Sequence, residues 1–237
     1  MDLHCHWVAG IDDGATTPEM GVEMLRALRA IGFDTVMATP HMRPGMFDNT
    51  RHALRAAYDR MGPFVAAADL PRTALSSEHY FDDVVFSRIM AGEGAPYPGE
   101  HAVLLEFYEI DFPPSIAHRF ADLRVKKKLV PVIAHPERYR AMWRDADVLE
   151  RLVDAGAAAL LDTAALVGKY GRQPRRCAEE LLERGLYHAA CSDAHRPKDV
   201  AEVAKGMKRI EKLYGSEEID FLFREGPLAL LEGRIPE

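Results

Sequence analysis

The sequence predicts an α/β fold in which parallel strands, each followed by a helix, form a closed or nearly closed (β/α)7 barrel. Short apolar segments alternate with helix-like segments along the chain, and this alternation is typical of a parallel sheet covered by helices. The apolar segments are nearly continuous, which indicates strands buried on both faces. A histidine, aspartate or glutamate follows most of these segments, and a closed barrel brings the ends of so many successive strands together.

The expected helices begin and end at recognisable signals. Thr17 and Pro18 fit the N-cap and the first helical position, and apolar residues recur at helical spacing until Gly32. The second helix is rich in alanine, leucine and arginine until Pro63 interrupts it. The helices are expected at residues 17–31, 49–68, 82–91, 114–127, 145–155, 174–184 and 198–213.

The expected strands are short and apolar. The first begins at residue 2 and ends in His4-Cys5-His6, and the second leads into Thr39-Pro40-His41, with His41 in the loop that follows. No Pro/Ser-rich linker divides the chain, so we expect residues 1–237 to form a single domain. The remaining strands are expected at residues 72–78, 101–107, 129–134, 157–162 and 187–191.

The composition limits the class of protein. A formal net charge of −7 argues against a surface that binds nucleic acid. The apolar stretches are too short to cross a membrane, and three cysteines suggest no disulfide framework. The chain opens without a secretory signal, from which we expect a cytoplasmic protein.

Nine candidate metal ligands lie at or near the ends of the expected strands. His4 and His6 are two residues apart on an extended segment, so their imidazoles share one face. Histidine nitrogen and carboxylate oxygen without obligatory thiolate suit manganese, iron or zinc. Nine ligands are too many for one ion, so we expect two or three divalent ions bridged by a carboxylate such as Glu78. The nine residues are His4, His6, Asp13, His41, Glu78, Glu106, His135, Asp193 and His195.

This set of ligands predicts hydrolysis of a phosphate ester. Cations close together turn water into a nucleophile near neutral pH and stabilise charge on the attacking and leaving oxygens. Arg138 lies three residues after His135 and can donate bidentate hydrogen bonds to phosphoryl oxygens. Arg43 lies in a Pro-Gly loop after His41, which is either a substrate-facing lid or a plain surface loop.

The candidate residues stand in short motifs that cover the chain from residue 1 to about residue 200. In this order the motifs resemble those of the polymerase-and-histidinol-phosphatase (PHP) superfamily. Within it the chain most resembles the CpsB/CapC/YwqE-like bacterial tyrosine-protein phosphatases of exopolysaccharide and capsule systems. The motifs are His4-Cys5-His6, Asp12-Asp13-Gly14, Thr39-Pro40-His41, Glu78, Leu105-Glu106-Phe107, His135-Pro136-Glu137-Arg138-Tyr139 and Ser192-Asp193-Ala194-His195.

The resemblance implies a distorted PHP barrel, a trinuclear centre usually occupied by manganese, and hydrolysis of phosphotyrosine by a metal-activated hydroxide. The implied substrate is a phosphotyrosine protein, a tyrosine autokinase that governs polysaccharide chain length or export. The implied metal sites are His4, His6, Glu78 and Asp193 for one ion, Glu78, Glu106 and His135 for a second, and Asp13, His41 and His195 for the third.

Further residues take their expected roles from the same resemblance. Asp13 matches the family ligand, and Asp12 beside it is a candidate partner of a ligand. Arg138 is the main candidate for contact with the phosphoryl group. Arg43 and Arg196 are further candidates, although Arg196 follows His195 more closely than the family's arginine does.

Three other functions remain to be compared with tyrosine phosphatase activity. A cysteine nucleophile requires Cys-x5-Arg, and none of the three cysteines has an arginine at that distance. Another PHP phosphoesterase, such as a histidinol-phosphate phosphatase, would use the same ligands. A non-catalytic accessory of the kinase would not need all nine. The sequence is compatible with an oligomer.

Overall fold

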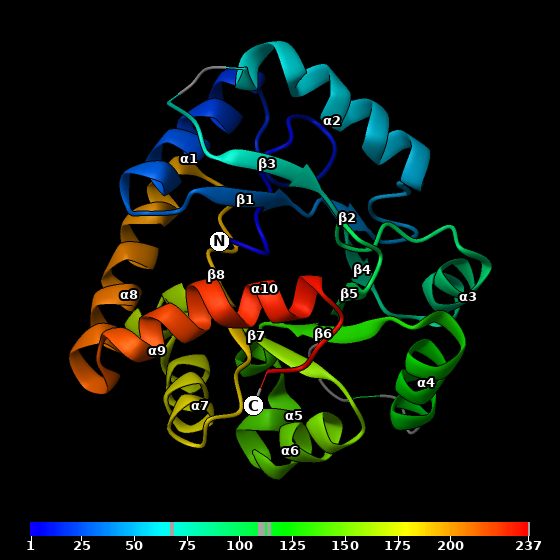
Figure 1. Cartoon of the computed structure of the whole chain (residues 1–237), viewed down its shortest axis with the longest axis vertical. Helices are drawn as coiled ribbons and strands as arrows, with labels where there is room; N and C mark the ends of the chain where they lie inside the picture. Colours follow the sequence, from blue (N-terminus) through cyan, green and yellow to red (C-terminus); the bar gives the residue numbers. More distant parts are fainter. Residues whose placement is uncertain (67–68, 109–111, 113–114, 237) are drawn as a thin grey trace.

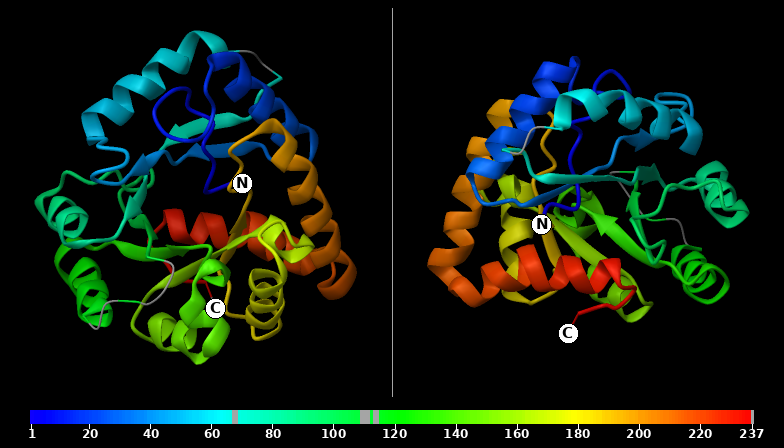
Figure 2. Two further views of the ribbon diagram at one scale, coloured as in Figure 1. Left: turned by 180° about the vertical axis from the view of Figure 1, so that it is seen from behind. Right: turned by 45° about the horizontal axis from the view of Figure 1, so that its top comes forward.

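The computed structural model describes residues 1–66, 69–108, 112 and 115–236, and its strands form a parallel barrel surrounded by helices (Figures 1 and 2). The named strands pair in parallel. Their bounds are β1 Thr35–Ala38, β2 His41–Met42, β3 Arg72–Leu75, β4 Glu78–Tyr80, β5 Ala102–Glu106, β6 Val130–Ala134, β7 Ala158–Asp162 and β8 Ala189–Cys191.

The opening segment of the chain closes the barrel. β2, β4, β5, β6, β7 and β8 form one sheet in that order, and β1 pairs with β3. β1 leads into β2 and β3 leads into β4, so each of these pairs fills one position of the barrel. The first residues fill the remaining gap, since Asp2 bridges Val36 of β1 and Cys5 bridges Ala194 just after β8. The expected α/β barrel is confirmed, with seven positions in its wall.

Two expected strands are less regular than the sequence suggests. The opening segment forms isolated bridges instead of a continuous strand. The strand expected at residues 72–78 is interrupted at Ser76 and Ser77, and the Ser77 hydroxyl donates to the Pro40 carbonyl oxygen at 2.7 Å. Pro40 itself has no N–H and separates β1 from β2. His41 therefore begins a second short strand and does not lie in a loop, which corrects the expectation.

Helices form the outer layer around the barrel. None in the described part of the chain is long and apolar enough to cross a membrane. The α-helices are α1 Pro18–Ala30, α2 Arg51–Val65, α3 Asp83–Ala91, α4 Ile116–Asp122, α5 Arg140–Arg144, α6 Asp147–Asp154, α7 Arg172–Glu183, α8 Val200–Tyr214, α9 Ser216–Asp220 and α10 Gly226–Leu231. Single π-helical turns are η1 Leu123–Lys127 and η5 Phe221–Glu225, and 3-10 turns are η2 Pro136–Arg138, η3 Thr163–Val167 and η4 Pro197–Asp199.

The helix predictions agree best where a cap is present. The Thr17 hydroxyl accepts the Met20 N–H at 3.3 Å and Pro18 is the first residue of α1, as expected. Pro63 lies inside α2, near its end, without ending it. The segment between β6 and β7 holds η2, α5 and α6 where one helix was expected, and the helices after α8 were not predicted. The expected end of α2 at residues 67–68 and the expected start of α4 at residue 114 lie outside the described residues.

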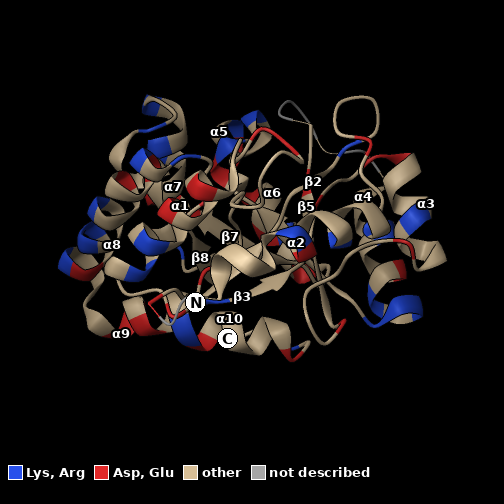
Figure 3. Ribbon diagram, turned by 90° about the horizontal axis from the view of Figure 1, so that it is seen from above, with Lys and Arg blue, Asp and Glu red and all other residues tan. Residues whose placement is uncertain are grey.

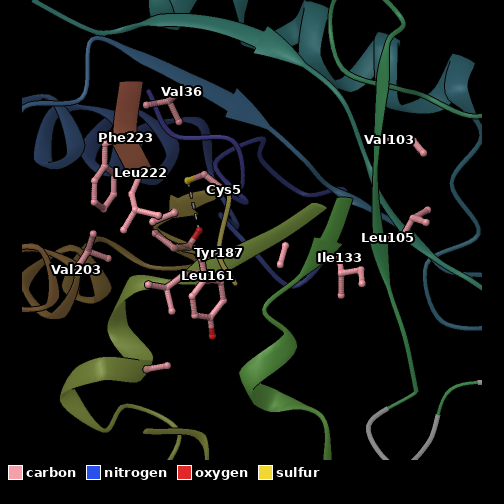
Figure 4. Packing of buried hydrophobic residues seen from close by; sticks show 14 of the residues in the cluster. Cys5, Val36, Val103, Leu105, Ile133, Leu161, Tyr187, Val203, Leu222 and Phe223 are labelled. Atoms are coloured by element: carbon pink, nitrogen blue, oxygen red, sulfur yellow. Dashed lines mark hydrogen bonds between the residues drawn. The ribbon is translucent and has the colours of Figure 1, made fainter. Parts of the chain in front are cut away.

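Side chains of the strands alternate between two apolar layers. In β5, Ala102 and Leu104 belong to the cluster inside the barrel, whereas Val103 and Leu105 pack against the helices. Figure 4 shows part of this outer layer, in which Val103 and Leu105 are labelled. Because the alternation has a period of two, Glu106 at the end of β5 continues the inner row and faces the carboxyl end of the barrel.

Helix α10 covers the opposite end of the barrel. Leu230 of α10 belongs to the inner apolar cluster, and α10 lies across the barrel in Figure 1. Gly226 permits this approach, since a Cβ atom at this position would overlap the carbonyl oxygen of His188, just before β8. The amino ends of the strands are therefore covered, which leaves the carboxyl ends as the place for an accessible site.

Candidate metal centre

The nine candidate ligands come together at the carboxyl end of the barrel. His4 and His6 lie on the opening segment, and Asp13 lies in the loop that follows it. His41 begins β2, Glu78 begins β4 and Glu106 ends β5. The remaining three come after strands: His135 directly after β6, and Asp193 and His195 in the segment after β8.

Glu78 lies at the centre of this cluster and is buried. Its Oε1 atom is 2.9 Å from His135 Nε2 and 3.3 Å from His4 Nε2. Its Oε2 atom is 3.0 Å from His41 Nδ1 and 3.4 Å from His6 Nε2. One carboxylate thus faces four imidazoles, which is the arrangement of a group that bridges cations.

Two further carboxylates face the same histidines. Asp193 Oδ1 is 3.1 Å from His4 Nε2 and 3.5 Å from His6 Nε2. Asp13 Oδ1 is 3.4 Å from His41 Nε2 and 3.5 Å from His195 Nε2. The side chain of Asp13 is 55% exposed, whereas that of Asp193 is buried, so the cluster opens to solvent on the Asp13 side.

The donor atoms fall into four overlapping groups, each with all its atoms within 4.8 Å of one another. Two groups resemble the expected partition, although one adds His6 and the other lacks Asp193, and the other two differ from it. His135 groups with His4 and Asp193, while Glu106 groups with His41 and Glu78. His41 thus belongs to two groups, at the junction between them. The groups are His6, Asp13, His41 and His195; His4, His6 and Glu78; His4, His135 and Asp193; and His41, Glu78 and Glu106.

Six donor atoms in this cluster are buried and make no hydrogen bond of suitable geometry among the described residues, although several lie within ion-pair distance of one another. Buried polar atoms are nearly always paired, because an unpaired one costs free energy. Unpaired atoms on six converging side chains fit a site that holds cations. The atoms are His4 Nε2, His6 Nε2, His41 Nδ1, Glu106 Oε2, His135 Nδ1 and Asp193 Oδ1.

Two of the histidines are oriented by contacts to residues outside the cluster. The Nδ1 atom of His4 is 2.6 Å from Thr39 Oγ1, and that of His6 is 2.7 Å from Asp12 Oδ2. These contacts leave both Nε2 atoms directed into the cluster, as outer partners of metal ligands do. Asp12 was expected in this role. Thr39 was not predicted, although it stands two residues before His41 in the same motif.

The backbone is strained where two ligands leave their strands. His135 has φ 36° and Asp193 has φ 41°, values that residues other than glycine seldom adopt. Each follows a buried strand, β6 for His135 and β8 for Asp193. Strain of this kind costs about 1–3 kcal/mol per residue and is concentrated at functional sites. The turn directs both side chains into the cluster.

The electrostatics of the cluster reflect many ionisable groups in little water. Burial, together with repulsion from Glu78, raises the pKa of Glu106 to about 7. Burial and the nearby Arg138 guanidinium lower the pKa of His135 to about 4. Burial also opposes the protonation of His41, but Glu78 and Asp13 overcome it and raise its pKa to about 10. Divalent cations would relieve the repulsion between the carboxylates.

Arg138 is the arginine most closely attached to the cluster. Its Nη1 atom donates to Asp193 Oδ2 at 2.6 Å, and its guanidinium carbon lies 4.6 Å from the centre of the Tyr170 ring. Its side chain remains 26% exposed. Asp193 and Tyr170 therefore fix the guanidinium at the edge of the site, where part of it reaches solvent.

The other two arginines contact different ligands or their backbone. Arg43 stacks over Tyr80 at 4.1 Å, and its Nη1 atom is 3.9 Å from Glu106 Oε2. The loop that carries it also places the Phe47 ring parallel to that of His41, with centroids 5.3 Å apart. Arg196 Nη1 donates to three backbone carbonyl oxygens, those of Asp13, Gly14 and His195.

Arg196 therefore connects the loop of Asp13 to the segment after β8. The carboxylate of Asp199 adds to this connection by accepting the backbone N–H groups of His195 and Arg196 at 3.0 and 2.9 Å. Asp199 was not singled out from the sequence, and its signal is weak, since an aspartate is common just before a helix such as α8. The two residues fix the backbone on either side of the exposed ligands.

Two other polar residues, each near a candidate ligand in sequence, are structural. His79 is buried, with Nδ1 2.9 Å from the Leu104 carbonyl oxygen and Nε2 accepting the Ala95 N–H at 3.0 Å. The Glu137 carboxylate accepts the Asp162 N–H at 3.0 Å and contacts the Tyr187 hydroxyl at 2.9 Å.

The cysteines are buried. Burial raises the pKa values of Cys5, Cys177 and Cys191, which disfavours the thiolate that a nucleophile requires. Cys5 instead packs in the outer apolar layer, and its thiol donates to the Ala194 carbonyl oxygen at 3.5 Å (Figure 4). A cysteine-dependent mechanism is thus unsupported by the environment of these thiols.

The fold and this cluster define a class: parallel α/β barrels with a candidate polynuclear metal centre at the carboxyl ends of their strands. Comparison with known families narrows the class further. Residues 1–232 match the family "Capsular polysaccharide synthesis, CpsB/CapC". The chain belongs to the CpsB/CapC family, as its motifs indicated.

Curated relatives match over nearly their whole length. The chain is 31% identical to tyrosine-protein phosphatase YwqE of Bacillus subtilis, and the match covers 99% of this chain and 92% of the relative. It is 24% identical to the putative tyrosine-protein phosphatase CapC of Staphylococcus aureus, with 99% and 92% covered. It is also 24% identical to tyrosine-protein phosphatase CpsB of Streptococcus pneumoniae, with 98% of each chain covered.

Solved structures agree with this family. One structure comes from work on YwqE of Bacillus subtilis and CpsB of Streptococcus pneumoniae, described as unique metal-dependent tyrosine phosphatases. It matches with a TM-score of 0.89 at 31% identity, and the match covers 98% of this chain and 94% of that chain. A phosphotriesterase homology protein from Escherichia coli has a TM-score of 0.56 at 12% identity, with 97% and 98% covered. The second likeness shows the shared barrel fold alone.

Proposed function

We propose that this protein is a metal-dependent protein-tyrosine phosphatase that hydrolyses phosphotyrosine in a protein substrate. The observation that carries the proposal is the convergence of nine histidine and carboxylate side chains at one end of the barrel, six of which present buried donor atoms without a well-formed hydrogen bond. Membership of the CpsB/CapC family supports the same activity, because relatives of that family are named tyrosine-protein phosphatases.

We propose two or three divalent ions in this centre, with manganese as the resident metal and iron or zinc as alternatives. The ligands would be His4, His6, Asp13, His41, Glu78, Glu106, His135, Asp193 and His195. Bound cations would supply the positive charge that lowers the pKa of a water molecule and stabilises the charge of the phosphoryl oxygens. The buried nitrogen and carboxylate donors, without a thiolate, suit these metals.

The arginines supply the remaining positive charge. Arg138 can orient phosphoryl oxygens because Asp193 and Tyr170 fix its guanidinium while part of it stays exposed. Arg43 would approach the substrate from the rim near Glu106, and Arg196 from the rim near Asp13. Together they would hold the phosphoryl group while charge builds on its oxygens.

The protein substrate we propose is a tyrosine autokinase of exopolysaccharide or capsule synthesis. The family's connection with capsular polysaccharide supports this partner. The opening of the site on the Asp13 side gives a tyrosine on another protein a route to the centre. We further propose that the protein acts in the cytoplasm and that residues 1–237 form a single phosphatase domain.

Metal analysis combined with phosphate release tests the proposal. Purified protein is assayed for bound metals and then given a phosphotyrosine peptide or histidinol phosphate at equal concentration. We expect the peptide to be the better substrate and turnover to require manganese. A strong preference for histidinol phosphate would support the alternative PHP phosphoesterase, and a fully metal-loaded protein inactive on both would contradict phosphatase activity.

A further inference from the structure

A second cavity, of about 770 Å³, lies outside the barrel between α2, α3 and β2. Met42 of β2 lines it, whereas the preceding residue, His41, faces the metal cluster. Because successive side chains of a strand point to opposite sides, the cavity and the cluster lie on opposite sides of β2. None of the nine candidate ligands lines the cavity, so it is a separate feature.

One wall of the cavity is basic. It contains Arg51 and Arg55 from the first turns of α2 and Arg88 from the end of α3. Figure 3 shows Lys and Arg on both helices. Arg51 and Arg55 pair with Glu100 and Asp59 through exposed side chains, and exposed pairs of this kind are weak.

Arg88 carries the clearest sign of a missing partner. Its Nη1 atom is buried and has no hydrogen-bond partner among the described residues. A buried guanidinium nitrogen without a partner costs free energy, and its natural partners are carboxylate or phosphate oxygens. Glu93 also lines the cavity, and no ion pair between it and Arg88 is found in the described part of the chain.

The first turn of α2 adds to the positive character of this wall. Thr50 caps the helix by accepting the Ala53 N–H, and Thr50 and His52 also line the cavity. The amino end of a helix of this length carries partial positive charge and favours anions. The helix end and the three arginines therefore both make this wall of the cavity positive.

The other wall is apolar. Met42, Leu75, Ala95 and Pro96 line it, and Met42 and Ala95 belong to one small buried apolar cluster. A volume of about 770 Å³ lies within the roughly 300–1,000 Å³ of small-molecule sites. An apolar wall facing a basic wall suits an anion with an apolar body, and a hollow of this volume suits a small molecule.

We propose that this cavity binds a small organic phosphate. The phosphate would lie against Arg88, Arg51 and Arg55, and the apolar body would lie against Met42 and Leu75. Binding here does not depend on the proposed phosphatase activity. The ligand would occupy the outer side of β2 while the metal centre occupies the inner side.

Phenylphosphonate is a suitable probe, because it combines a phosphonate dianion with an apolar ring and has no ester bond to hydrolyse. Crystals of the metal-loaded full-length protein are soaked with it, and its affinity is measured by calorimetry for the wild type and for Arg88→Met. We expect the phosphonate beside Arg88 in the crystal and at least a tenfold loss of affinity at this site in Arg88→Met. Turnover of a phosphotyrosine peptide should stay within about twofold, because Arg88 does not touch the metal cluster.

Arg151→Met is the matched control, since Arg151 is an exposed arginine of α6 that does not line the cavity and its loss changes the net charge equally. Phenylphosphonate at the metal centre alone, or unchanged binding by Arg88→Met, would overturn the proposal. So would binding of a polyglutamate peptide in place of phenylphosphonate. If Arg88→Met does not fold, the exposed double variant Arg51→Gln/Arg55→Gln must show the same loss.

Discussion

Glu78 illustrates how much a single side chain depends on its neighbours in this protein. Four histidines from three separate parts of the chain lie within 3.4 Å of its carboxylate oxygens. A lone buried glutamate would carry a raised pKa, yet despite burial the histidines, led by His4 and His41, hold its pKa well below the ordinary value. The ionised carboxylate is the form that binds cations.

His41 offers the sharpest test of the metal centre at the residue scale. We expect His41→Ala to reduce turnover at least about a hundredfold, since even outer partners of metal ligands contribute about 10–100-fold. The fall should accompany a loss of bound metal, measured by elemental analysis, because His41 belongs to two of the four ligand groups. Unchanged metal content and turnover in this variant would contradict its role.

Cys5→Ser is the companion variant. Cys5 lies between two candidate ligands in sequence, but its thiol is buried and donates to a backbone carbonyl, a contact that serine can reproduce. We expect turnover within a few-fold of the wild type. An inactive Cys5→Ser protein that still binds metal would indicate a different mechanism.

Arg138→Lys tests whether guanidinium geometry matters beyond charge. Lysine keeps the charge but cannot contact Asp193, Tyr170 and a phosphoryl oxygen together. The loss of one charge-assisted hydrogen bond, about 1.5–3 kcal/mol, predicts about a tenfold to hundredfold lower kcat/KM toward a phosphotyrosine peptide. Arg140→Lys, at an exposed position two residues away, should have no effect. Equal kinetics for both variants would remove Arg138 from the mechanism.

At the scale of elements, the edge between β7 and β8 contains a pH-sensitive contact. His188, just before β8, is buried and accepts the Ala159 N–H on Nδ1 at 3.1 Å, and burial lowers its pKa to about 4. In the unfolded chain His188 therefore binds a proton below about pH 6.5, whereas in the folded chain it binds one only below about pH 4. Stability from this residue is complete above about pH 6.5 and falls as the pH drops through that window, by up to about 3 kcal/mol.

His188→Asn removes this titration while keeping an acceptor near the Ala159 N–H. Urea denaturation at about pH 7 and about pH 4.5 should show a smaller loss of unfolding free energy in the variant than in the wild type. The difference between the two proteins isolates His188 from other groups that titrate. Parallel losses would show that His188 is not neutral in the folded state.

Helix α8 depends on the absence of a side chain at one position. Gly206 packs so closely on η3 that a Cβ atom would overlap the Thr163 carbonyl oxygen. Gly206→Ala should therefore lower the free energy of unfolding by about 1–3 kcal/mol, even though alanine favours helices. Lys205→Ala on the exposed side of α8 should change it by less than about 0.5 kcal/mol. Denaturation midpoints measure both, and a stabilised Gly206→Ala would show that the helix can move away.

The strands and helices also show which patterns in the sequence were reliable. α1 was predicted closely because Thr17 and Pro18 are local signals that act within one turn. The break between β3 and β4 was missed because it depends on Ser77 contacting Pro40, a residue 37 positions away. The helices after α8 were missed because they are short, and packing on the amino ends of the strands, as at Leu230, supports them.

For the whole molecule, removal of metal provides a test. The cluster gathers four carboxylates at one end of the barrel, and cations that bind only the folded state stabilise it by mass action. At a metal concentration about a hundred times Kd, this stabilisation is about 2.7 kcal/mol. We expect a chelator to lower the unfolding temperature of the wild type in calorimetry and to have a smaller effect on His41→Ala. An unchanged unfolding temperature after verified metal removal would contradict coupling of the metal centre to the fold.

The sequence by itself determined the class of fold, the family and the membership of the candidate site. Buried parallel strands leave nearly continuous apolar segments, and ligands at strand ends stand directly beside those segments in sequence. The fold class and the candidate ligands can therefore be recognised from short stretches of sequence. Asp12 was found for the same reason, because it adjoins Asp13. Only the tertiary structure decided which ligands share a group, why Thr39 and Asp199 matter, and that Arg196 holds backbone carbonyls. These contacts depend on distances across the barrel. Such distances are set by how the strands close into a barrel, and the spacing of residues in the sequence does not reveal them.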